Sequence, residues 1–197
     1  MCLASLGLLV LTVFTVGGCR LPRQSQTPRY WMLAPLEGTR PVSEIGRSVG
    51  VGPVEFPEYL DRHSVVRRTS ANQLHVAEFE LWGQSLRENF TQVLGQNLES
   101  LAPGVVAVPF PWKGPDQNLT YRVVVEVDRF DAGPDDQVAL DAVWALHRGA
   151  SAGWVTGGRT AIREPIQGEG YAAIVAAMSQ AVGALSREIA PHLEGVR

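Results

Sequence analysis

Two segments whose apolar residues recur at three- and four-residue steps place the strongest constraint on the fold of this chain. The first set is Trp82, Leu86, Phe90, Val93, Leu94, Leu98 and Leu101, and the second is Tyr171, Ile174, Val175, Met178, Val182, Leu185, Ile189 and Leu193. An α-helix has about 3.6 residues per turn, so each set forms one stripe along a helix. The spacing therefore predicts two long helices, over residues 82–102 and 170–194, each with one face buried.

Short alternating segments bounded by turn residues predict strands around these helices. They cover residues 30–33, 48–56, 65–69, 73–77, 105–108, 121–128, 137–147 and 154–164. Residues 70–72 predict a β-hairpin, and Gly157 and Gly158 predict a turn or bulge within the last segment. A strand, a long helix and another strand predict a βαβ unit with at least one parallel pair. We therefore expect a single α/β domain: a mixed twisted sheet with a βαβ unit and antiparallel strands, and two long helices packed on one face.

The first residues of the chain have the pattern of a signal peptide. Leu6 to Val16 form an apolar run that is too short to cross a bilayer as a helix. Val16-Gly17-Gly18-Cys19 resembles a bacterial lipobox, which predicts removal of a signal peptide over residues 1–18 and acyl chains on Cys19. Several acyl chains on one residue give stable anchoring. An ordinary signal peptide cut near Gly18 and an apolar N-terminal helix remain open as alternatives.

The residues around this run add two expectations and one open question. Residues 1–7 contain no Lys or Arg, although signal peptides usually begin with positive charge, so a start upstream of Met1 remains open. Arg20 stands where an aspartate would favour retention in the inner membrane, so we expect delivery to the outer membrane. Residues 19–29 are polar and carry two prolines, which predicts a flexible linker to a single domain over residues 30–197.

Composition narrows the class of protein. Removal of residues 1–18 leaves 179 of the 197 residues, enough for one domain with a real core. The net charge of −3, with both signs interspersed, argues against a nucleic-acid-binding surface. Cys2 would leave with the signal peptide and Cys19 would carry lipid. We therefore expect no disulfide and a fold that depends on its hydrophobic core.

The sequence predicts no catalytic residue. Residues 46–50 match the G-x-S-x-G pattern of a hydrolase nucleophile, which requires a strand before the serine and a helix after it. Here a polar loop precedes Ser48 and an alternating segment follows it, so Ser48 is interpreted as a strand residue.

The sequence predicts no metal or cofactor site either. The histidines lack the spacing of metal ligands; they are His63, His75, His147 and His192. Four aspartates lack the glycine-centred loop and terminal glutamate of a calcium site and are interpreted as a solvated hairpin; they are Asp128, Asp131, Asp135 and Asp136. The glycine-rich residues 149–158 lack the G-K-[ST] of a phosphate-binding loop.

One segment has the composition of a protein-contact surface. Residues 56–62 and 78–82 combine aromatic side chains with both signs of charge, and a hairpin carrying Arg67 and Arg68 separates them. The candidate partner-binding residues are Tyr59, Asp61, Arg62, Arg67, Glu78 and Trp82. The alternative is internal: Asp61 and Glu78 would pair with Arg62 or Arg67 and hold the hairpin against the first helix.

Across these residues the chain resembles a known family. The segments that carry the resemblance are Val49–Val54, Pro57–Arg62 (P-E-Y-L-D-R), Leu74–Phe79 and Trp82, with further agreement at Tyr30–Leu33, Arg129–Asp131 and Val138–Trp144. In this order they are similar to the PqiC-type auxiliary lipoproteins of ABC-like and MCE-protein transport systems. The resemblance covers nearly the whole mature chain. One departure is His63-Ser64, where the family often has a proline.

The resemblance implies an outer-membrane lipoprotein on the periplasmic face of a Gram-negative envelope, acting as an accessory or docking subunit without catalysis. Its implied partner is a PqiB-like MCE-domain protein of the inner membrane, in a system that moves phospholipids or other hydrophobic molecules. Some members of the family form homo-oligomeric rings. Two other functions remain open. One is a lipoprotein that binds a lipid or small molecule, which requires a cavity. The other is an envelope hydrolase, which requires a nucleophile beside a base.

Overall fold

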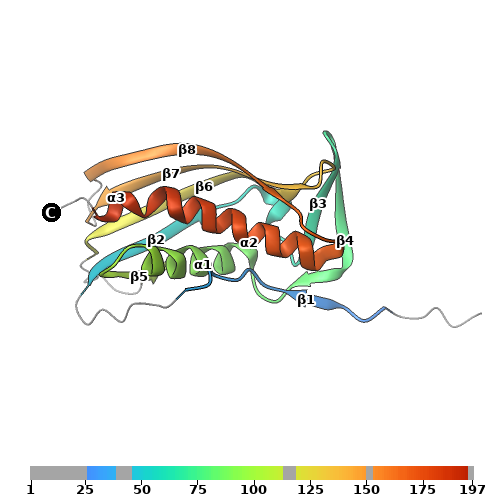
Figure 1. Ribbon diagram of the computed structural model, residues 1–197, viewed down its shortest axis with the longest axis horizontal. Helices are drawn as coiled ribbons and strands as arrows, with labels where there is room; N and C mark the ends of the chain where they lie inside the picture. The colour runs from blue at the N-terminus through green and yellow to red at the C-terminus, as the bar shows by residue number, and fades with distance from the viewer. Residues whose placement is uncertain (1–25, 39–45, 113–118, 150–152, 195–197) are drawn as a thin grey trace, which may run out of the picture.

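A mixed eight-stranded sheet carries two long helices on one face (Figure 1). The structure is a computed structural model that describes residues 26–38, 46–112, 119–149 and 153–194. The strands are β1 (Arg29–Trp31), β2 (Arg47–Glu55), β3 (Ser64–Ser70), β4 (Gln73–Trp82), β5 (Val105–Pro109), β6 (Tyr121–Ala132), β7 (Gln137–Arg148) and β8 (Gly153–Pro165). The helices are η1 (Glu58–Leu60), α1 (Leu86–Leu101), α2 (Gly170–Ile189) and α3 (Pro191–Glu194). The expected α/β class, mixed sheet and pair of helices are confirmed.

Strand β6 organises the sheet because three strands pair with it. β7 runs antiparallel along its length, and β2 runs parallel to it as far as the pair Glu55–Glu126. β3 meets β6 through the single pair Arg67–Ala132. Since β7 occupies one edge of β6, β2 and β3 share the other edge. The sheet therefore forks: β2 and β5 lie along one branch, and β3, β4 and β1 along the other.

The core lies between the sheet and the helices. Phe90 of α1 packs edge-on against both Phe56 and Phe130, with ring centroids 5.3 and 5.5 Å apart. Leu94 of α1 and Leu185 of α2 are completely buried, as the apolar stripes predicted. Figure 1 shows α1 and α2 side by side on the same face of the sheet.

Both predicted helices are longer than the observed ones. Trp82 is the last residue of β4, and its backbone N–H donates to the His63 carbonyl at 2.7 Å. It lies four residues before Leu86, so it fits the helical stripe although it belongs to a strand. The second helix ends at Ile189, and Pro191 begins α3, because proline has no N–H with which to continue the helical hydrogen bonds.

Two details of strand pairing also differ from the prediction. The parallel partner of β5 is β2, whereas β4, which directly precedes α1, lies in the other branch. The bulge in β8 falls at Val155, because Leu146 pairs with Thr156 and His147 with Trp154. Gly157 is regularly paired, and a Cβ on it would lie 2.7 Å from the Trp144 carbonyl oxygen. Glycine at this position therefore permits close approach of the two strands.

The predicted signal peptide, the lipobox and Cys19 lie outside the described residues. The chain enters the described fold at residue 26 and reaches the sheet at β1, which pairs in parallel with the last residues of β4. Across the described ranges, the structure contains no helix that is both long and apolar enough to span a membrane.

Candidate protein-contact site

A fully buried carboxylate ties the predicted contact segment to the sheet. Asp131 was expected in a solvated hairpin, but it lies within β6 and its side chain has no exposed surface. The Tyr59 hydroxyl donates to Asp131 Oδ2 at 2.8 Å, and Arg68 Nη2 donates to the same oxygen at 3.2 Å. Arg129 Nε donates to Asp131 Oδ1 at 2.9 Å. Two guanidinium groups and a phenol thus compensate a carboxylate whose burial would otherwise be costly.

These four residues, Tyr59, Arg68, Arg129 and Asp131, form what we refer to as the Asp131 cluster. Burial, followed by the charge of Asp131, raises the pKa of Tyr59 to about 12, so its hydroxyl remains a donor at neutral pH. The Arg68 guanidinium lies 5.9 Å from the centroid of the Tyr59 ring, within cation–π range. The cluster therefore fixes the turn η1 against β3 and β6.

A second polar network holds β1 to the sheet. Arg29 Nε donates to Glu80 Oε1 at 2.9 Å, and Trp31 Nε1 donates to Glu80 Oε2 at 2.7 Å. Burial of Glu80 opposes its ionisation, but the hydrogen bonds from Arg29 and Trp31 outweigh that cost and lower the pKa of the carboxyl. The first strand after the linker is thereby tied to β4.

The structure divides the predicted contact residues into three groups by their exposure. Asp61, Arg62, Arg67 and Glu78 are exposed, whereas Tyr59 is half-buried. Trp82 is only 5% exposed and belongs to the core, which corrects the expectation that it contributes contact area. The six residues do not form one cluster: Tyr59 points to Asp131, and the exposed charges surround η1 and the hairpin.

The alternative, in which these charges pair within the chain, is correct in part. Asp61 is paired, but its partner is not one of the two expected arginines. Asp61 Oδ2 lies 3.4 Å from Arg87 Nη2 in the first turn of α1, so the turn after η1 is linked to the helix. Within the described part of the chain, Arg62, Arg67 and Glu78 have no ion-pair partner. These three charges are therefore free to meet another molecule.

Sequence reasoning missed the Asp131 cluster because its charged neighbours resembled a loop. One pattern could have predicted the longer strand: Phe130 and Ala132 alternate with polar residues, so the strand pattern continues past residue 128. The burial of Asp131 itself has no local signal, since it depends on Tyr59 and Arg68, both more than sixty residues away.

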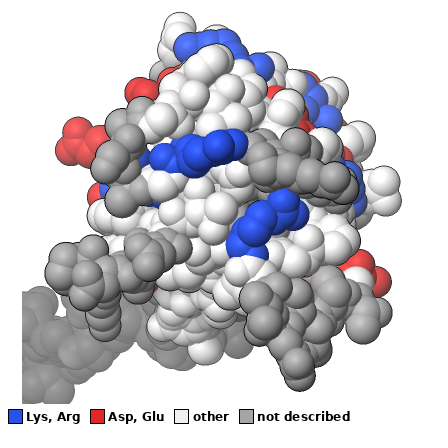
Figure 2. Space-filling model, turned by 90° about the vertical axis from the view of Figure 1, so that its left-hand side faces the viewer, with Lys and Arg blue, Asp and Glu red and all other residues white. Residues whose placement is uncertain are grey.

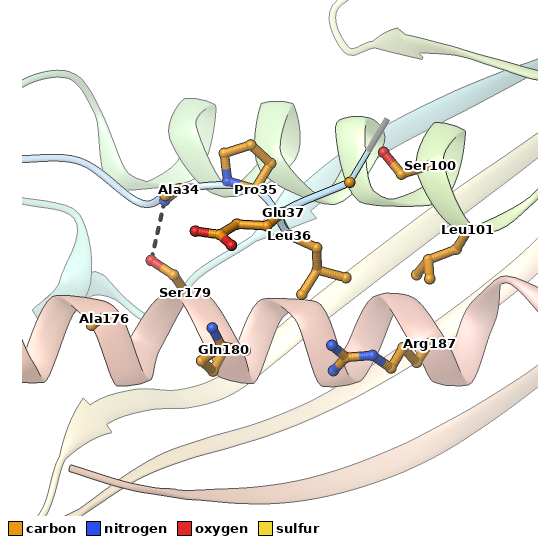
Figure 3. Close-up of a pocket in the computed structure, with 11 residues that line it drawn as sticks. Ala34, Pro35, Leu36, Glu37, Ser100, Leu101, Ala176, Ser179, Gln180 and Arg187 are labelled. Carbon is orange, nitrogen blue, oxygen red and sulfur yellow. Dashed lines mark hydrogen bonds between the residues drawn. The ribbon is translucent and has the colours of Figure 1, made fainter. Parts of the chain in front are cut away.

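A groove between α1 and α2 is occupied in part by the chain that follows β1 (Figure 3). Three backbone N–H groups of this segment donate to helix side chains: Leu33 to Asn89 Oδ1 at 2.7 Å, Ala34 to Ser179 Oγ at 3.1 Å and Leu36 to Asn97 Oδ1 at 2.8 Å. The open remainder of the groove measures about 660 Å³. Leu36, Leu101, Ser100, Gln180 and Arg187 line it, together with the backbone of residues 34–38.

The candidate catalytic and metal-binding residues do not converge. Ser48 lies in β2, as expected, and its Oγ accepts a hydrogen bond from the Thr120 backbone N–H at 3.2 Å. Across the described residues, no three His, Cys, Asp or Glu side chains lie together as a metal site requires.

Comparisons with known proteins identify relatives of this chain. Residues 30–190 match the family described as "ABC-type transport auxiliary lipoprotein component". The chain is 27% identical over 145 residues to "Intermembrane transport lipoprotein PqiC" of Escherichia coli (strain K12), covering 72% of this chain and 74% of that protein. The protein of the same name from Shigella flexneri matches equally well.

Two solved structures share the fold. The crystal structure of an uncharacterised protein has a TM-score of 0.71 and 26% identity, covering 86% of this chain and 100% of that one. A protein from Xanthomonas campestris has a TM-score of 0.64, covering 82% and 92%, and at 16% identity this likeness concerns the fold alone. Since the family match spans most of the sequence, the chain belongs to the family of ABC-type transport auxiliary lipoprotein components.

Proposed function

We propose that this chain is an accessory subunit of an intermembrane lipid transport system, anchored through Cys19 to the periplasmic face of the outer membrane. It acts as a docking or assembly subunit, without catalysis of its own. The observation that carries the proposal is the family match over residues 30–190. The name of its relatives, intermembrane transport lipoprotein, agrees with it.

The proposed partner is a PqiB-like MCE-domain protein of the inner membrane, and the same surface is available to a second copy of the chain. Arg62, Arg67 and Glu78 supply directional charge at this surface, which sets orientation and register between partners. The Asp131 cluster supports this role because a contact residue on a fixed backbone loses less entropy on binding.

Charge reversal tests the docking surface. We expect Arg62→Glu with Arg67→Glu to reduce copurification with the MCE-domain partner while the melting temperature stays unchanged. Arg163→Glu is the matched control, since Arg163 is a strand arginine paired with Asp141. Tyr59→Ala is less informative, because loss of the bond to Asp131 should also lower stability. Undiminished copurification of the double variant would remove this segment from the interface.

Fractionation tests the anchor. If Cys19 carries lipid, Cys19→Ser should leave the protein unprocessed or release it into the periplasm. Retention of the wild-type chain in outer-membrane fractions, and of the variant in soluble ones, is the expected result. A variant that is retained in outer-membrane fractions like the wild type contradicts lipidation at this residue.

A second candidate function is the binding of a lipid or small molecule. The groove of about 660 Å³ between α1 and α2 favours it, because Leu36 and Leu101 offer apolar surface beside the cationic Arg187. Mass spectrometry of the purified protein under native conditions would detect a retained ligand. A mass equal to that of the acylated chain alone would favour the docking role.

A further inference from the structure

Three arginines gather at the end of the sheet opposite β1. Arg47 is the first residue of β2, Arg122 the second of β6 and Arg148 the last of β7. Their strands are neighbours, and the pairs Val49–Tyr121 and Tyr121–Arg148 bring these strand ends together. We refer to Arg47, Arg122 and Arg148 as the arginine end. Figure 2 views this end of the molecule and shows cationic side chains near its centre, with acidic ones toward the rim.

None of the three arginines has an ion-pair partner among the residues that the structure describes. Several other arginines on the same sheet are paired with carboxylates. Arg159 lies 2.8 Å from Asp128, for example, further along β8. The positive charge of the arginine end is therefore uncompensated within the described fold.

Aromatic rings fix two of these guanidinium groups in place. Arg122 lies 5.8 Å from the centroid of the Trp112 ring, and its Nε donates to the Gly149 carbonyl at 3.1 Å. Arg148 lies 5.9 Å from the centroid of Tyr121. A stacked guanidinium keeps its edge donors available, and these donors match the two oxygens of a carboxylate. The rings thus lie within cation–π range of the two guanidinium groups without neutralising them.

Exposed aromatic side chains lie beside Arg122. Trp154 is 68% exposed and sits opposite His147, which in turn pairs with Arg122 across the sheet. Phe110 is 46% exposed and packs edge-on against Trp112, with ring centroids 5.2 Å apart. Rigid aromatics beside arginines are the composition of binding hot spots between proteins.

The arginine end lies away from the strand at which the chain enters the described fold. Arg122 and Ala132 are ten residues apart in β6, so at about 3.3 Å per residue they lie roughly 30 Å apart. Ala132 touches the branch of the sheet that carries β1, where the chain arrives from the linker. The arginine end is therefore about 30 Å along β6 from the branch at which the chain enters the described fold.

We propose that the arginine end, with Trp154 and Phe110, is a docking surface for an acid-rich segment of a partner protein. The inference rests on the proposed function, since it takes that segment to belong to a subunit of the same transport system. Carboxylates complement the positive charge of the arginines. The exposed rings favour a partner segment that has apolar side chains next to its carboxylates. The surface is separate from the Asp131 cluster, which lies at the opposite end of β6.

Binding of the full-length lipoprotein, purified in detergent, to the MCE-domain partner tests this inference. We expect Arg122→Glu with Arg148→Glu to raise the Kd about tenfold or more, and wild-type binding to weaken with salt. Trp154→Ala should also weaken binding, and as an exposed residue it should not disturb folding. Arg159→Glu, the matched control, should bind like the wild type. Wild-type affinity in both the double variant and Trp154→Ala overturns the inference.

A second measurement separates failure of this inference from failure of the proposed function. If the wild-type chain does not bind the MCE-domain partner, the proposed function fails. A photo-crosslinking residue at position 154, introduced in cells, then decides the inference by itself. Crosslinks that mass spectrometry maps to an acid-rich segment of one envelope protein, and that Arg122→Glu with Arg148→Glu abolishes, support it. Crosslinks to phospholipid alone, or crosslinks that persist in the double variant, overturn it.

Discussion

The two ends of the sheet differ in whether arginines are paired with buried carboxylates. At the hairpin end, which comprises η1, β3, β4 and β1, Arg68 and Arg129 surround a buried carboxylate and Arg29 binds Glu80. At the arginine end, Arg122 and Arg148 stack on aromatic rings and have no carboxylate partner in the described residues. An arginine paired with a buried acid contributes to folding, whereas a stacked and unpaired arginine remains available to bind.

The two ends also differ in how firmly backbone hydrogen bonds attach their strands to β6. The hairpin branch meets β6 through one pair of residues, so backbone hydrogen bonds alone hold it weakly. The side chains of the Asp131 cluster supply the missing connection. At the arginine end, β2, β6 and β7 are regularly hydrogen-bonded, so its side chains are not needed for attachment.

The largest expected effect is the loss of the buried carboxylate. Asp131→Ala should lower the free energy of unfolding by about 4 kcal/mol, because it leaves two partly buried guanidinium groups and a phenol without their acceptor. Denaturant unfolding measures this change. Asp128→Ala, which removes an exposed carboxylate paired with Arg159, should cost less than about 1 kcal/mol. Similar losses for the two variants would contradict a structural role for the cluster.

The next largest effect on stability should come from a smaller side chain in the core. It gives a reference value for the effect of Asp131→Ala. Leu94 is completely buried between α1 and the sheet, so Leu94→Ala should cost about 3 kcal/mol through lost burial and a residual cavity. The same unfolding experiment applies. A cost below about 0.5 kcal/mol, typical of surface positions, would mean that α1 buries a different face.

A smaller effect, dependent on pH, is expected at Tyr59. Tyr59→Phe should cost about 1 kcal/mol near neutral pH, the usual value of one hydrogen bond. The folded pKa of about 12 exceeds the ordinary value of about 10, so this stabilisation is complete below about pH 10 and is lost as pH rises toward 12. The stability difference between wild type and Tyr59→Phe should therefore stay constant up to about pH 10 and shrink between about pH 10 and about pH 12. A constant difference would show that the phenol titrates normally.

The smallest effect on stability should come from the arginine end. Arg148 is exposed and stacks on Tyr121, so Arg148→Glu should change the free energy of unfolding by about 0.5 kcal/mol or less. Thermal and denaturant unfolding of this variant beside Asp131→Ala give a direct comparison of the two ends. A loss comparable to that of Asp131→Ala would mean that both ends stabilise the fold, and the contrast between them would disappear.

The elements of this fold could be predicted from the sequence wherever the pattern is local. The apolar spacing of residues 86–101 and 171–189 identifies α1 and α2, because a helix brings residues three and four apart onto one face. The alternation in residues 137–148 likewise identifies β7 and its buried face. The same reasoning fails at Trp82, whose position suits a helix and a strand equally well.

The sequence by itself determined the α/β class, the hairpin, the family and the residue types available for contact. Only the tertiary structure decided that Asp131 is buried, that β5 pairs with β2, and that three arginines from three strands meet at one end. Local periodicity reflects the geometry of one helix or strand. The pairing of charges depends on residues brought together from distant parts of the chain, for which a single sequence carries no comparable signal.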